Sequence, residues 1–199
     1  MKRFTAGRWA LLVALLLAAT TGCSTTGKPG APVLSAAGIA EQNDTIRPVV
    51  EKLAVNVREL RVIYEDLHIL ARDTLSGADP ERQLDYVQKV YLYVEAALLV
   101  AESEYKMLSV LNYIKDARRT DYLTLRAGGL DEALMRMNRT IEFIALYEAF
   151  ITNPKVTATI ARGQALIQGN IYLYGQLLDI LQPWVHPAGS FTADPYAPI

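Results

Sequence analysis

Two histidines occur in the chain, and one of them, His68, follows Glu65 at the spacing of a Glu-x-x-His pair. Residues three apart share a face of an α-helix, and helical bundles that hold two iron ions use two such pairs plus two further carboxylates. The second histidine, His186, lies in a proline-rich stretch, so a second pair is missing. We therefore predict that Glu65 and His68 are surface residues and that the protein holds no metal or other cofactor.

Three glutamates, Glu95, Glu102 and Glu104, are the best candidates for acid–base chemistry. A buried carboxylate acquires the raised pKa that a general acid requires. The sequence offers no nucleophile or oxyanion donor beside them, and a solvated helix face explains them more simply. It also has no Walker loop, dinucleotide fingerprint, zincin helix or Ser-His-Asp order. We predict a protein that is not an enzyme, with an enzyme lacking familiar motifs as a remaining alternative.

The first residues have the organisation of an export signal. Lys2, Arg3 and Arg8 precede an uninterrupted apolar run from Ala10 to Ala19. As a helix this run would be about 15 Å long, which is half of the roughly 30 Å hydrocarbon core of a bilayer. A positive start followed by a short apolar run is typical of a secretory signal peptide. We assign residues 1–22 to it.

The residues that follow, Thr20, Thr21, Gly22 and Cys23, place small side chains before a cysteine. This pattern resembles the lipobox of bacterial lipoprotein precursors. The resemblance implies a diacylglycerol thioether on Cys23, cleavage before it and acylation of the new amino group. Cys23 is the only cysteine, so an exported chain could form no internal disulfide, and lipidation would use up the thiol. Ser24 follows the cysteine in place of aspartate, which in this family favours an outer-membrane location facing the periplasm where the cell has two membranes.

Composition divides the remaining chain into three parts. Residues 23–43 are rich in Ser, Thr, Gly, Ala and Pro and are expected to form a flexible tether after the lipidated cysteine. Residues 44–183 are expected to form the folded domain, and residues 184–199 a proline-rich aromatic tail that lies along the domain or engages a partner. Without the signal peptide, 17 basic residues face 21 acidic ones, a net charge of −4. This balance has no nucleic-acid-binding signature.

Apolar residues at alternating spacings of three and four predict long helices throughout the domain. The first helix contains Pro48, which is tolerable only close to its start. The second runs from Pro80 to about Arg118, the third starts near Asp131, and the fourth runs from Pro154 to before Pro183. Residues 120–129 are ambiguous, because two glycines at their end should stop a helix. The predicted fold is an all-α, antiparallel up-and-down bundle of about four long helices.

Glycines and tyrosines within the helices carry two further expectations. Gly163, Gly169 and Gly175 each cost the fourth helix about 1 kcal/mol relative to alanine. Close helix approach is the expected compensation, and a hinge is the alternative. The tyrosines should lie at the margin of the core, where the hydroxyl group can find a hydrogen-bond partner. A face that binds another protein is the functional alternative for them.

Basic residues gather where the second helix is expected to end. Cations at a helix C-terminus are stabilised by the helix dipole, which explains the cluster without any ligand. In the expected bundle, however, this end faces the membrane, and anionic headgroups attract basic side chains. The candidate partner or membrane surface therefore consists of Lys115, Arg118, Arg119, Arg126 and Trp184.

Together these features predict a cell-envelope lipoprotein attached to the membrane by its lipid. Its helical domain is expected to act as a non-enzymatic interaction or scaffold module with a protein partner in the envelope. A bundle that holds a small apolar ligand or a lipid is the alternative, suggested by the aromatic core margin and the glycines of the fourth helix.

Overall fold

A computed structural model describes residues 35–73, 80–115 and 118–185. The expectations for the signal peptide, for Cys23 and for tail residues 186–199 fall outside these ranges. Four long helices make up the fold: α2 (Ala36–Asp73), α3 (Pro80–Ser109), α4 (Arg118–Glu148) and α5 (Pro154–Val185). A short 3-10 helix, η2 (Val110–Tyr113), follows α3 directly. No strand occurs within the described ranges, so the predicted all-α class is confirmed.

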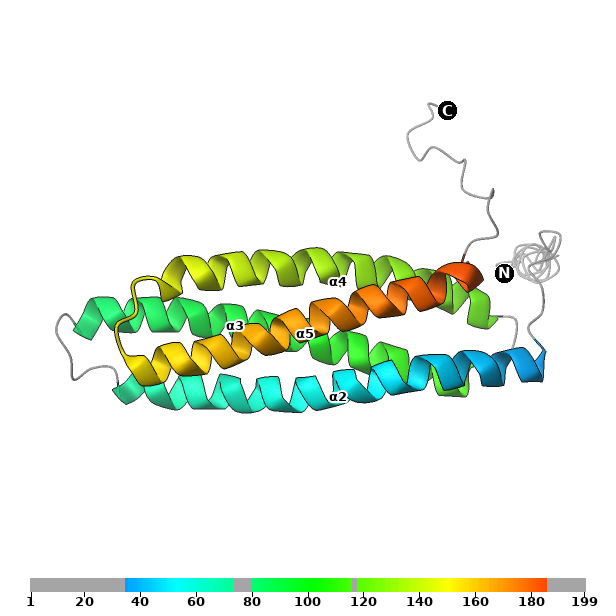
Figure 1. Ribbon diagram of the computed structural model, residues 1–199, viewed down its shortest axis with the longest axis horizontal. Helices are drawn as coiled ribbons and strands as arrows, with labels where there is room; N and C mark the ends of the chain where they lie inside the picture. Colours follow the sequence, from blue (N-terminus) through cyan, green and yellow to red (C-terminus); the bar gives the residue numbers. More distant parts are fainter. Residues whose placement is uncertain (1–34, 74–79, 116–117, 186–199) are drawn as a thin grey trace, which may run out of the picture. The chain divides into compact units, whose positions relative to one another are not determined.

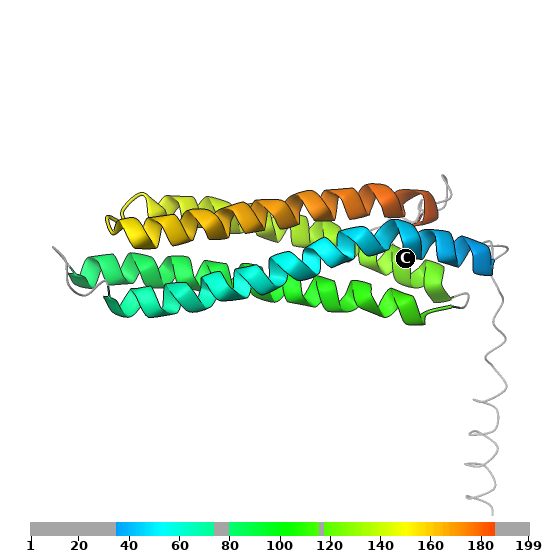
Figure 2. The ribbon, with the colours of Figure 1, turned by 60° about the horizontal axis from the view of Figure 1, so that its bottom comes forward.

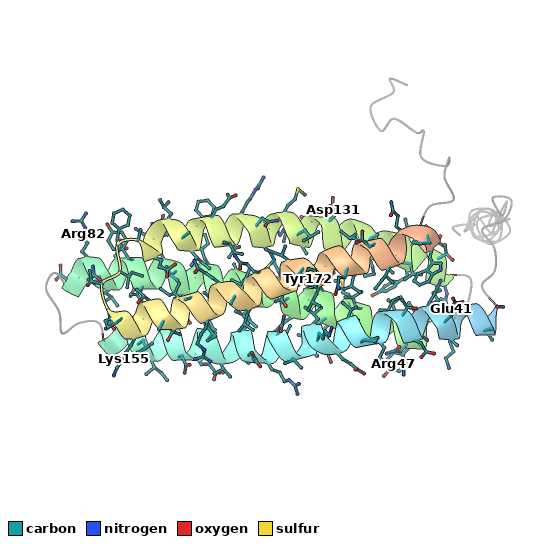
Figure 3. The ribbon with its side chains drawn as sticks, in the orientation of Figure 1. Glu41, Arg47, Arg82, Asp131, Lys155 and Tyr172 are labelled. Atoms are coloured by element: carbon teal, nitrogen blue, oxygen red, sulfur yellow. The ribbon has the colours of Figure 1, made fainter. Side chains whose placement is uncertain are left out.

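Consecutive helices run in opposite directions and form a four-helix bundle (Figures 1 and 2). Each of α2 and α4 packs against both α3 and α5, whereas α3 and α5 touch only slightly. We call the end that holds the start of α2, η2, the start of α4 and the end of α5 the proximal end. The opposite end, where α3 and α5 begin, is the distal end. Figure 3 labels Glu41 and Arg47 near the proximal end and Arg82 and Lys155 near the distal end.

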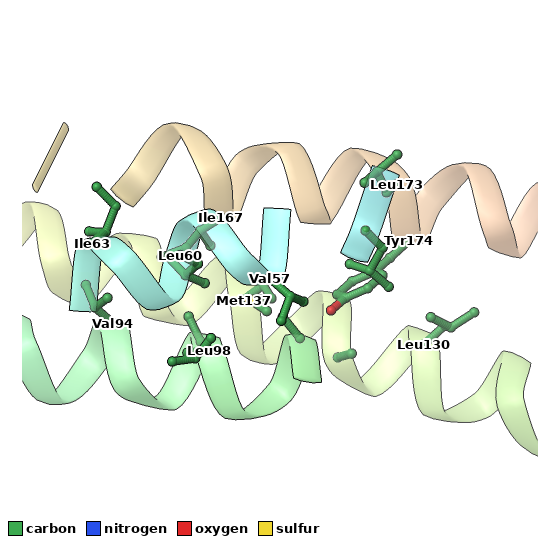
Figure 4. Close-up of a cluster of buried hydrophobic side chains, with 14 of the residues drawn as sticks. Val57, Leu60, Ile63, Val94, Leu98, Leu130, Met137, Ile167, Leu173 and Tyr174 are labelled. Carbon is green, nitrogen blue, oxygen red and sulfur yellow. The ribbon is translucent and has the colours of Figure 1, made fainter. Parts of the chain in front are cut away.

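The core follows the heptad pattern of the sequence. In α2, Ile46, Leu53, Leu60 and Leu67 recur every seven residues and are all buried. Figure 4 shows side chains from all four helices meeting in one such cluster. Within the described ranges, the residues of the core cluster lie between Ile46 and Leu181, and all but Ile151, in the connection between α4 and α5, belong to the helices. None of the helices in the described part of the chain is long and apolar enough to span a membrane.

Helix α2 begins earlier than the composition predicts. Residues 36–43, expected to belong to the tether, form its first two turns. Pro48 consequently lies inside the helix, and the prediction that the helix starts just before it is wrong. Pro48 is exposed, so water can reach the backbone carbonyl that its missing N–H leaves unpaired. Burial of Ile39 and Gln42 in the bundle supplies the packing that extends the helix.

The junction between the second and third helices also differs from the prediction. Helix α3 ends at Ser109 and not near Arg118, and α4 begins at Arg118 and continues through Gly128 and Gly129. The ambiguous segment 120–129 is therefore helical. Leu123 and Leu130 are fully buried seven residues apart, and this packing offsets the glycine cost of about 1 kcal/mol per residue.

Helix α5 uses two of its glycines for close packing. A Cβ atom at Gly163 would lie 3.1 Å from Cγ2 of Ile63, and one at Gly169 would lie 3.0 Å from Nδ2 of Asn56. The expected close approach of α5 is thus confirmed at these positions and specifically involves α2. It does not hold at Gly175, where a Cβ would meet nothing within 4 Å.

Candidate functional site

The Glu-x-x-His pair lies on the surface, as predicted. Glu65 and His68 are both exposed on α2, and the ring of His68 lies 5.4 Å from that of Tyr91 on α3. No group of three or more His, Cys, Asp or Glu side chains within the described ranges is arranged to hold a metal ion. The pair therefore contributes to the surface between α2 and α3.

Two of the three candidate glutamates join α2 to α3. The Tyr64 hydroxyl donates to Oε1 of Glu95 at 3.1 Å and accepts from the Tyr91 hydroxyl, while the two tyrosine rings stack at 4.6 Å. Glu102 accepts a hydrogen bond from Arg61. The Tyr91 hydrogen bond, with desolvation and the contact with Glu95, raises the pKa of Tyr64 above its ordinary value. The Tyr64 hydroxyl therefore links α2 to α3 through hydrogen bonds to Tyr91 and Glu95.

Glu104 departs from its predicted place on a solvated face, because only 8% of it is exposed. Arg126 of α4 donates to its carboxylate at 3.5 Å and also contacts the sulfur of Met107. Burial raises the pKa of Glu104, whereas the positive charge of Arg126 opposes this effect. Glu104 and Arg126 thus form a buried ion pair at one position of the interface between α3 and α4, which is otherwise lined mainly by apolar side chains.

A shallow pocket opens beside this ion pair because Gly129 has no side chain. A Cβ atom at Gly129 would lie 3.4 Å from the Arg126 guanidinium. The pocket is also lined by Glu132 and Arg136, which form an exposed ion pair within one turn of α4. Its four ionisable side chains carry equal numbers of opposite charges. The electrostatics of this pocket therefore select neither an anion nor a cation.

Arg119 was expected on an exposed basic cluster and is instead fully buried. Its guanidinium donates to the side-chain oxygens of Gln42 at 2.8 Å and Asn43 at 2.7 Å, both on α2. It also donates to the backbone carbonyls of Leu111 and Ile114 at the end of η2. Burial lowers the pKa of Arg119 from its ordinary value. Arg119 thus satisfies carbonyls that the end of a helix leaves unpaired.

The other members of the predicted basic and aromatic surface are divided between surface and core. Arg126 is buried, so neither it nor Arg119 belongs to an exposed patch. Lys115 and Arg118 are exposed at the proximal end. The prediction that the fourth helix ends before Pro183 is wrong, because α5 includes Pro183 and ends at Val185. Trp184, expected in the tail, therefore lies in the last turn of α5, half-buried against the core. The structure therefore does not bring these five residues together into one surface.

Five aromatic side chains instead form a continuous row along the boundary between α3 and α4, toward the distal end. We call this row the aromatic edge. Its rings stack with Tyr93 against Phe143 at 4.9 Å, Tyr93 against Tyr147 at 6.0 Å and Tyr86 against Phe150 at 5.1 Å. Tyr86 and Tyr147 lie 6.3 Å apart and join the two halves. Aromatic pairs at such separations attract each other beyond the effect of buried area.

The aromatic edge is partly open to solvent and is held by polar contacts at its distal end. Phe143 is 43% exposed and Phe150 is 49% exposed. The Lys89 ammonium lies 5.3 Å from the Tyr147 ring centre. Gln83 donates to the Phe150 carbonyl at 2.8 Å and accepts from the Thr152 amide at 2.9 Å, which ties the turn between α4 and α5 to α3. The rings are therefore presented on a fixed backbone.

The sequence does not predict the aromatic edge, although it does predict that tyrosines lie at the margin of the core. Tyr86 and Tyr93 are seven residues apart on α3, and Phe143, Tyr147 and Phe150 recur at spacings of four and three near the end of α4. Each set alone resembles the margin of a core. Only the packing register of the two helices places them side by side.

Comparisons of the chain with models of protein families, with curated proteins and with solved structures give no match.

Proposed function

We propose that this protein is a lipid-anchored envelope lipoprotein whose bundle binds another envelope protein through the aromatic edge. The proposed binding of a partner rests on the exposure of Phe143 and Phe150 within a row of five stacked rings. Aromatic residues are enriched at the hot spots of protein interfaces because they bury a large area with little loss of conformational freedom.

The construction of the edge supports binding of a partner protein. Side chains that are already stacked lose little further freedom when a second surface covers them, so less of the binding energy is spent on ordering. The neighbouring cation Lys89 lies over two of the rings and is paired with Asp85 at 2.7 Å. A partner that presents apolar side chains to the rings and polar groups to this ion pair fits the edge.

The proposed lipid anchor rests on the sequence around Cys23. A lipid on Cys23 would tie the chain to the membrane on the side where α2 begins. The aromatic edge lies toward the distal end of the bundle. Under this proposal, the edge faces away from the anchoring membrane and toward proteins of the periplasm.

The packing of α5 favours this function over the small-ligand alternative. Two of the glycines that suggested a ligand site face side chains of α2. Ile63 fills the space beside Gly163, and Asn56 fills the space beside Gly169. These glycines therefore serve helix contact, and they do not support a ligand cavity between α2 and α5.

Capture from cross-linked envelopes tests the proposed interface. Replacing Phe143 and Phe150 together by serine is expected to reduce recovery of the partner protein at least about thirtyfold, the effect of one interface hot spot. Quantitative mass spectrometry of material captured with each form of the protein measures the change. The half-exposed positions of both rings should leave the bundle folded, which circular dichroism checks.

Tyr172→Ser is the matched control, because Tyr172 is an aromatic residue of α5 that is 66% exposed and lies outside the edge. It should recover the partner as well as the unaltered protein does. Equal recovery by the double variant, or no protein recovered specifically with the unaltered chain, would overturn the proposed interface.

A further inference from the structure

The proximal end exposes apolar side chains beside basic ones. Tyr113 of η2 is 83% exposed, the largest exposed fraction among the large apolar residues described, and Val110 of the same short helix is 42% exposed. The exposed cations Lys115 and Arg118 follow in the connection to α4 and at its first residue. The aromatic edge differs in that its rings stack on one another.

A cleft of about 350 Å³ lies at the same end, between the start of α2 and the segment after η2. Ala36, Ile39 and Ala40 form its apolar lining, and Asn43 and Lys115 supply its polar groups. The cleft therefore places an ammonium group next to an apolar surface. Phospholipids have the matching arrangement, with an anionic phosphate next to acyl chains.

The early start of α2 shortens the segment that links the bundle to Cys23. Residues 24–35 separate the cysteine from the helix, instead of the longer stretch to residue 43. Twelve residues span at most about 40 Å even when fully extended. A lipid on Cys23 would consequently keep the proximal end within a short distance of the headgroups.

We propose that the proximal end binds the surface of a membrane that contains anionic phospholipids. This inference rests on the proposed function, because it uses the anchor at Cys23 to select the membrane. Lys115 and Arg118 lie near the phosphates, and Tyr113 and Val110 enter the interface, where aromatic rings with one polar end are favoured. Such contact orients the bundle so that the aromatic edge points away from the membrane.

Acidic side chains at the same end limit the purely electrostatic part of this binding. Glu41 and Asp121 are exposed, whereas Asp44 is paired with Arg47 at 2.7 Å. Charge alone therefore does not account for the attraction, and the apolar contact of Tyr113 is needed as well. Both contributions can be measured separately.

Sedimentation of residues 24–199, which lack Cys23 but contain the whole core, with lipid vesicles tests the inference. Vesicles of phosphatidylethanolamine with phosphatidylglycerol should bind this chain, and phosphatidylcholine vesicles should bind it much less. Lys115→Gln should weaken the binding about fivefold, since one basic residue near an anionic surface contributes about that factor. Tyr113→Ser should weaken it at least as much, because it removes the most exposed ring.

Lys155→Gln and Tyr172→Ser are the matched controls, since both residues are exposed and lie away from the proximal end. They should bind the vesicles like the unaltered chain. Absence of binding to anionic vesicles, or equal weakening by the proximal and control substitutions, would overturn the inference. Because these vesicles contain no protein partner, such a result would leave capture through the aromatic edge, and hence the proposed function, untouched.

Discussion

Arg119→Met is expected to lower the free energy of unfolding by about 3–5 kcal/mol, because it leaves four hydrogen-bond acceptors without this donor, and each buried unpaired group costs about 1–3 kcal/mol. In a domain of this size the midpoint of thermal unfolding should fall by roughly 6–20 °C. Methionine keeps much of the apolar volume of the side chain, so the loss reports mainly on the hydrogen bonds. Thermal and urea unfolding followed by circular dichroism measure the change.

The size of this effect follows from what Arg119 connects. One guanidinium holds the side chains of Gln42 and Asn43 on α2 together with two carbonyls at the end of η2. Without it, the buried oxygens of Gln42 and Leu111 would lose a donor, and so would the partly buried oxygens of Asn43 and Ile114. Lysine has one compact ammonium group, which cannot reach the four acceptors that the planar guanidinium contacts. Arg119→Lys should therefore be more stable than Arg119→Met but less stable than the unaltered protein.

Arg118→Met supplies the control at the adjacent position. Arg118 is exposed, and exposed charged contacts contribute less than about 1 kcal/mol to stability. The two substitutions remove the same chemical group one residue apart in the chain. Equal destabilisation by both would contradict the structural role assigned to Arg119.

Cys23→Ala is expected to abolish incorporation of labelled palmitate and to move the protein from the membrane fraction to the soluble fraction. Each buried CH₂ group contributes about 0.8 kcal/mol to membrane binding, and the proposed anchor carries two or three acyl chains. Their removal should therefore change the fraction that stays bound to salt-washed membranes from nearly all to nearly none. Fractionation of cells expressing either form, with a label count on the purified chain, measures both effects.

A wash with about 0.5 M salt separates the lipid anchor from the proposed contact of the proximal end, because salt screens electrostatic binding and does not extract acyl chains. Ser24→Ala, which changes the next residue and keeps the thiol, should remain labelled and bound. Palmitate incorporated into the Cys23→Ala chain, or retention of that chain on salt-washed membranes after its signal peptide has been removed, would contradict the assignment of the anchor.

The helical bundle itself was predictable because each helix repeats its apolar residues at the period of a buried face. Leu53, Leu60 and Leu67 in α2 illustrate this, since their spacing alone predicts one face and all three are fully buried. Asn153 followed by Pro154 likewise predicted the start of α5, and the Asn153 side chain accepts a hydrogen bond from the Lys155 amide at 3.0 Å. Local chemistry and periodicity were sufficient at these positions.

Prediction failed where packing between helices outweighed local preference. Arg119, Arg126 and Glu104 are charged residues that ordinarily face water, and only the neighbouring helices supply the partners that allow their burial. Pro48 and Gly129 were expected to limit helices, yet buried neighbours on both sides keep these helices continuous. The aromatic edge was missed for the same reason, because it is a property of two helices in register.

Photo-cross-linking in intact cells tests most directly whether the aromatic edge contacts a partner protein. A photoreactive phenylalanine analogue at position 143 places the reactive group on the edge, and the same analogue at position 172 places it on exposed α5. We expect a discrete protein adduct from position 143 on intact cells and none of that mass from position 172. The same adducts from both positions, or none from position 143 in a correctly anchored chain, would contradict the proposed interface.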